Sequence, residues 1–183
     1  MKKLLTISLA LGLSTLLMAN EPTTPNKTEV KTTQIDEHGI VTKQSAVDVN
    51  TTMNRLETLV TKKGANVFNR IDHQANAKKA GGADIDEAQL LIFGKPKVGL
   101  KMMTKDPKAG LDLPLKMLVY KAKDGQVYIS YRDVAFYEKI YNLEGCKVHY
   151  KMSKFLGMLS SKVTLSQEEF DAFLATKAKE SKK

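Results

Sequence analysis

The sequence predicts an α+β domain whose elements follow the order strand, helix, four strands, helix, with an antiparallel sheet and helices mainly on one face. The clearest signal is Asp124-Gly125, which joins strand patterns over residues 115–121 and 127–131 as a hairpin. Asp-Gly favours the backbone twist that paired strands need. The second signal is the helical spacing of apolar residues over 50–63 and 148–159. Strands that follow one another late in a chain favour antiparallel pairing.

The first half of the chain alternates between strand and helix patterns. They predict strands over residues 39–43, 66–71 and 89–93 and helices over residues 50–63 and 74–80. Asp72 stands where its side chain caps the second of these helices, which stops at Gly81-Gly82. The run Gln89–Phe93 is nearly continuously apolar and too short for a helix. We therefore expect a strand that is buried on both faces.

The pattern is less regular over residues 97–113. Val98, Met102 and Met103 are spaced for one short helix, and Asp106-Pro107 predicts the start of a second. Pro114 then leads into the strand 115–121, where proline is tolerated at the first position. After the hairpin, residues 134–141 predict another helical segment. A capping box over 166–169 starts a last helix that ends in a lysine-rich tail.

The first residues have the layout of a secretory signal peptide. Lys2 and Lys3 precede an apolar run from Leu4 to Met18, and small Ala19 follows. We expect residues 1–19 to be cleaved near Ala19, which gives a periplasmic or secreted product with no membrane span in the mature chain. The alternative is an uncleaved anchor, although the run is shorter than the roughly 20 residues that cross a bilayer. Residues 20–37 are polar and predict a flexible leader.

Composition limits the partners. The chain has 183 residues, is 42% hydrophobic and 27% charged, and carries a formal net charge of +9. One globular domain fits this length, and we place it at residues 38–160, followed by a C-terminal helix and tail at 161–183. The lysines are scattered, and an exported protein does not meet nucleic acid, so we expect a solvated surface and no nucleic-acid partner. Cys146 is the single cysteine and predicts a buried, inert thiol; the alternative is a reactive or intermolecular one.

Several spaced motifs resemble one family. The matching segments are Arg70–Gly81, Leu90–Pro96, Leu111–Tyr120 and Asp124–Tyr131. They resemble DUF302, a family of uncharacterised bacterial domains, over roughly residues 38–160. The resemblance implies a fold like that of the TATA-box-binding-protein class and frequent dimers, and it implies no established activity. The family usually has asparagine where this chain has Lys95, which puts any ligand contact of that asparagine in doubt here.

Two places carry candidate chemistry. His73, with Asp72 to orient it, has the side-chain types of a general acid/base pair at a helix start. The alternative is that Asp72 is simply the helix cap. The loop after residues 89–93 ends a strand, and such loops often form pockets. The predicted ligand-binding residues are Asp72, His73, Phe93, Gly94, Lys95, Pro96, Met103, Leu113 and Pro114.

Three functions stay open at this point. The first is an exported, non-enzymatic module that binds a small molecule, a lipid or an envelope protein. The second is an enzyme that uses His73 as general acid/base, and the third is a structural homodimer. The sequence has no nucleophile elbow, phosphate-binding glycine loop, Cys-x-x-Cys or His-Glu-x-x-His motif. We therefore expect no cofactor and no metal site.

Overall fold

The computed structural model describes residues 34–82 and 84–180. The expected signal peptide (1–19) and most of the expected leader (20–37) lie outside these residues. The elements are β1 (Gln34–Ile35), β2 (Ile40–Ser45), α1 (Val49–Lys62), β3 (Asn66–Asp72), α2 (His73–Lys79), β4 (Ala88–Gly94), α3 (Pro96–Met103), η1 (Pro107–Leu111), β5 (Leu115–Lys121), β6 (Val127–Arg132), η2 (Val134–Lys139), α4 (Val148–Val163) and α5 (Gln167–Glu180). The two η elements are 3-10 helices.

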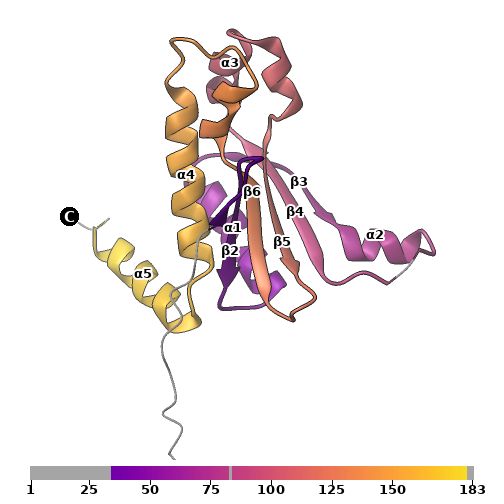
Figure 1. Ribbon diagram of the computed structural model, residues 1–183. Helices are drawn as coiled ribbons and strands as arrows, with labels where there is room; N and C mark the ends of the chain where they lie inside the picture. Colours follow the sequence, from indigo (N-terminus) through magenta and orange to yellow (C-terminus); the bar gives the residue numbers. More distant parts are fainter. Residues whose placement is uncertain (1–33, 83, 181–183) are drawn as a thin grey trace, which may run out of the picture. The chain divides into compact units, whose positions relative to one another are not determined.

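The strands form one antiparallel sheet in the order β1-β2-β6-β5-β4-β3 (Figure 1). The predicted α+β fold class is therefore confirmed, with the two-residue β1 added at one edge. The hairpin between β5 and β6 is present, and Gly125 supplies its left-handed residue at φ 78°. A bulge between Val67 and Asn69 interrupts the ladder between β3 and β4. Phe68 lies in this bulge.

Helices cover one face of the sheet, as predicted. In β4 the side chains of Gln89, Leu91 and Phe93 are buried. The expectation that this strand is buried on both faces is wrong, because Leu90 and Ile92 are only half-buried. An antiparallel sheet covered on one side produces this alternation. The apolar residues of β4 are thus divided between a packed face and an open one.

Two helices supply most of the packed face. Met53 and Leu56 of α1 are fully buried, and so are Leu156 and Leu159 of α4, apart from a trace of exposure. The hydroxyls of Tyr131 on β6 and Ser160 on α4 lie 3.4 Å apart, which places α4 on the same face. Within the described residues, no helix is long and apolar enough to cross a membrane.

The last helix is attached through a buried arginine. Arg55 of α1 donates to the carbonyl oxygen of Leu165 (2.6 Å) and to the side chain of Gln167 (2.7 Å). Its guanidinium lies 4.2 Å from the ring centre of Phe170. The predicted capping box is confirmed, since the Glu169 amide donates to Ser166 Oγ and the Ser166 amide donates to Glu169 Oε2. These contacts pack the start of α5 against α1.

Candidate functional site

The site begins where the chain leaves the sheet. Phe93, near the end of β4, pairs with Leu115 at the start of β5. Residues 94–114 therefore leave and re-enter neighbouring strands at adjacent positions, and they fold into α3 and η1 between them. We call this segment the cap. Met102 and Ala109 of the cap are fully buried, so the cap is packed onto the domain as part of its core.

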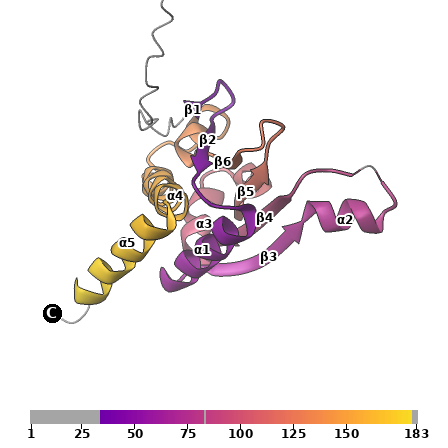
Figure 2. The same ribbon diagram turned by 90° about the horizontal axis from the view of Figure 1, so that it is seen from below.

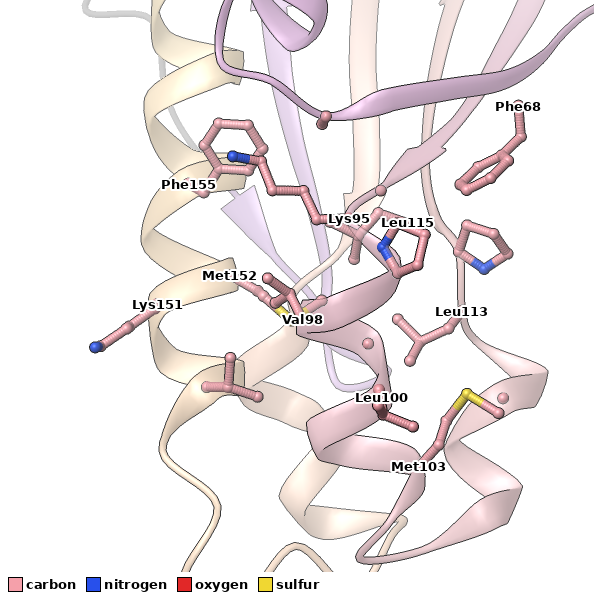
Figure 3. A pocket seen from close by; sticks show the side chains of 17 residues that line it. Phe68, Lys95, Val98, Leu100, Met103, Leu113, Leu115, Lys151, Met152 and Phe155 are labelled. Carbon is pink, nitrogen blue, oxygen red and sulfur yellow. The ribbon is translucent and has the colours of Figure 1, made fainter.

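A cavity of about 560 Å³ lies between the cap, the first residues of β3 and β5, and α4 (Figure 3). Its walls are apolar and come from three segments of the chain, residues 65–68, 94–115 and 148–155. The lining residues are Ala65, Phe68, Gly94, Lys95, Pro96, Val98, Gly99, Leu100, Met103, Gly110, Leu113, Pro114, Leu115, Val148, Lys151, Met152 and Phe155. Two glycines keep the walls close together: a Cβ on Gly99 would lie 3.4 Å from Leu113 Cδ1, and one on Gly110 would lie 3.3 Å from Met103 Cε.

Charge at the cavity is of one sign. Among its lining residues only Lys95 and Lys151 are charged, and none is acidic. Figure 3 shows the Lys95 side chain extending across one end of the cavity, whereas Lys151 points away from it. The surrounding surface is hydrocarbon and methionine sulfur. The cavity can therefore hold an apolar group and present one ammonium group at its edge.

Two aspartates fix the cap. Asp106 is buried and accepts the backbone N–H groups of Lys108 (3.0 Å) and Asn142 (3.1 Å). The Asn142 N–H is the largest cause that lowers the pKa of the Asp106 carboxyl below its ordinary value. Asp112 accepts the Tyr141 hydroxyl at 2.6 Å, and its backbone oxygen accepts the Tyr137 hydroxyl at 3.2 Å. Burial, followed by the hydrogen bond to Asp112, raises the pKa of Tyr141 to about 12.

The structure brings six of the predicted ligand-binding residues to this cavity. They are Gly94, Lys95, Pro96, Met103, Leu113 and Pro114. Phe93 points into the packed face and is fully buried. Asp72 and His73 lie elsewhere, because β3 runs from Asn66 beside Gly94 to Asp72 beside Gln89. Over seven strand residues that is about 20 Å. The expectation that Asp72 and His73 flank the same pocket is therefore not met.

Asp72 is the N-cap residue of α2. Its carboxylate accepts the Ala75 N–H at 2.9 Å and caps α2, which begins at His73. Among the described residues, His73 donates no hydrogen bond to Asp72, so the two do not form an oriented pair in this conformation. Figures 1 and 2 both show α2 projecting from the sheet on the side opposite to α4.

Sequence reasoning missed the walls that other elements contribute. Met152 and Phe155 of α4 belong to the helical pattern over residues 148–159, but that pattern does not show which element the helix contacts. Phe68 is half-exposed in the β-bulge, and a bulge has no sequence signal here. No cluster of three or more His, Cys, Asp or Glu side chains suited to a metal ion occurs within residues 34–82 and 84–180. Cys146 is buried, with its sulfur 3.7 Å from the Lys101 carbonyl oxygen.

Comparison with known proteins gives the family. The sequence model described as "Domain of unknown function DUF302" matches residues 41–159. The chain belongs to the DUF302 family. A crystal structure of an uncharacterised conserved DUF302 protein from Bacillus stearothermophilus superposes with a TM-score of 0.61 at 16% identity, and the match covers 69% of this chain and 98% of the other. At that identity the likeness shows the fold alone.

Longer relatives contain a similar segment. The DUF302 chain is 35% identical over 109 residues to fluoride-specific ion channel FluC 1 of Brucella suis and to FluC 1 of Brucella abortus. The match covers 60% of this chain and 42% and 40% of those proteins. The chain thus spans about two fifths of the length of these relatives.

The anchoring of the DUF302 cap by Asp106 predicts a pH dependence. The pKa of Asp106 in the folded state lies below the ordinary value of 3.8. The Asp106 carboxylate therefore stabilises the fold at pH values above 3.8, and this contribution is lost as the pH falls through the lower, folded-state pKa. Asp106→Asn places an amide NH2 against one of two backbone N–H groups and lowers the free energy of unfolding at neutral pH. Measured by denaturant unfolding, the free energy of unfolding of this variant falls less between neutral pH and about pH 2 than that of the wild type. Exposed Asp86→Asn serves as the control; parallel curves for wild type and Asp106→Asn would contradict the assignment.

Proposed function

We propose that this DUF302 domain binds a small amphiphile, with its apolar part in the cavity beneath the cap and an anionic group at Lys95. The observation that carries the proposal is the lining of the cavity: apolar side chains from three segments of the chain, with lysines as the only charged residues. Cavities of roughly 300–1,000 Å³ with such walls are the usual form of small-molecule sites. Burial of hydrocarbon there is favourable by roughly 25 cal/mol per Å².

Lys95 indicates the chemistry of the ligand's polar head group. A cavity that is apolar throughout accepts hydrocarbon without orienting it. Lys95 is exposed at the start of α3, and its side chain crosses one end of the cavity (Figure 3). An ammonium group there favours a carboxylate or phosphate over a neutral head. A fatty acid or a similar single-chain anion has both required parts.

The cap supports selective binding, because it is held in place before any ligand arrives. Asp106 and Asp112 tie it to residues 137–142, and Met102 anchors it in the core. A preformed cavity does not spend binding energy on ordering its walls. Catalysis by His73 would take place away from this cavity and is a separate hypothesis.

Location and assembly are part of the proposal. The charged start and apolar run of residues 2–18 support export, so that the ligand is met outside the cytoplasm. A homodimer is the second candidate role. It is supported by the open face of the sheet, where Leu90, Leu118, Tyr120 and Tyr128 are only half-buried.

A charge placed in the cavity wall is expected to weaken binding. Met103 lines the cavity and is partly exposed, so Met103→Glu leaves the fold intact and sets a carboxylate beside the ligand chain. We expect the Kd for dodecanoate, measured by displacement of a fluorescent fatty acid, to rise about tenfold or more. Leu111→Glu is the matched control, since Leu111 is exposed on the neighbouring η1 and does not line the cavity. Equal losses in both variants would contradict the cavity as the site.

The lysine at the cavity edge has its own test. Lys95→Gln is expected to weaken dodecanoate binding by up to about fivefold, which is the range for an exposed ion pair, and to leave dodecanol binding unchanged. Lys97→Gln removes a neighbouring exposed lysine that does not line the cavity, and it should change neither affinity. If Lys95→Gln weakens the binding of dodecanoate and of dodecanol equally, the ammonium group does not contact the carboxylate of the ligand.

A further inference from the structure

The outer surface of the cap carries large apolar side chains in water. Leu111 of η1 is 79% exposed, Leu100 of α3 is 59% exposed and Met103 is 42% exposed. Leu100 lies on the side of α3 away from Val98 and Met102, which face the core. Exposed leucines scattered singly are ordinary, but these lie on two short helices of one segment.

The same segment is rich in lysine. Residues 95–116 contain six lysines and two aspartates. Asp106 offsets one of these lysines, because its carboxylate lies 3.8 Å from Lys108 Nζ. Asp112 accepts the Tyr141 hydroxyl. Lys97, Lys101 and Lys108 are exposed beside the exposed leucines. The cap therefore presents exposed apolar side chains together with an excess of lysines.

We propose that the cap docks on an anionic membrane surface. Leu100 and Leu111 enter the boundary between head groups and acyl chains, while the lysines lie at the level of the phosphates. Short amphipathic surfaces with basic flanks bind bilayers in this way, by burying a shallow apolar face and by attraction to anionic lipid. Long lysine stems let the ammonium groups stay in water while the methylene groups lie along hydrocarbon.

The docking surface adjoins the cavity. Leu100 and Met103 line the cavity and are also exposed at the surface of the cap. A cap seated on a bilayer thus sets the cavity beside acyl chains, the kind of apolar group that its walls accept. Docking does not require an occupied cavity, so the failure of either proposal is separable from the failure of the other.

The sequence allows a site-specific test in the full chain, because it contains no tryptophan. Leu111→Trp introduces a single fluorophore at the proposed contact. Ile85→Trp, at a partly exposed residue between α2 and β4, is the matched control. The vesicles contain phosphatidylglycerol with brominated acyl chains, which quench only a tryptophan that touches them. The readout is local, so membrane binding by residues 4–18 does not imitate it.

We expect quenching and a blue shift of the tryptophan at position 111 and neither at position 85. Brominated phosphatidylcholine vesicles should quench position 111 much less. Adding Lys97→Gln and Lys101→Gln to the Leu111→Trp chain should raise the lipid concentration for half-maximal quenching by about fivefold for each lysine. Equal quenching at positions 85 and 111, no quenching at 111, or no dependence on the lysines would overturn the proposal. If the tryptophan at position 111 is not quenched, the partner of this surface is a protein and not a membrane.

Discussion

The pairing of Phe93 with Leu115 is the constraint on which the site depends. It fixes both ends of a 21-residue excursion, residues 94–114, at adjacent positions of one ladder. A segment with its ends held together has to fold back on itself, and here it does so as α3 and η1. Burial of Met102 and Ala109 then holds the cap against the domain. With α4 on the other side, this arrangement leaves an apolar cavity at the end of the sheet.

Local sequence signals predicted the elements well, because each depends on neighbours along the chain. Asp124-Gly125 predicts the hairpin, and Asp72 predicts the N-terminal end of helix α2. Ser166 and Glu169 predict the capping box of α5. The errors arose where distant segments decide the outcome. The apolar run of β4 indicated burial but could not show that only one face is covered. The motifs around Asp72 and Gly94 predict a single pocket, whereas the length of β3 separates the two residues.

The candidate site was predictable in part for the same reason. Residues on the cap are close in sequence, so the sequence predicts six of them as a group. The contributions of Met152, Phe155 and Phe68 come from α4 and from a β-bulge, and no local pattern connects them to the cap. Met103 and Leu100 both line the cavity, and both are also exposed on the outer surface of the cap. This double placement links the proposed ligand site to the proposed membrane contact.

The most direct measurement of the central claim is a crystal structure of the chain with 12-bromododecanoate. Anomalous scattering from bromine locates the end of the acyl chain without reliance on weak density. We expect a bromine peak in the cavity between α3 and α4 and a carboxylate within hydrogen-bonding distance of Lys95 Nζ. A bromine peak on the open face of the sheet, or no peak at ligand concentrations that saturate binding in solution, would contradict it.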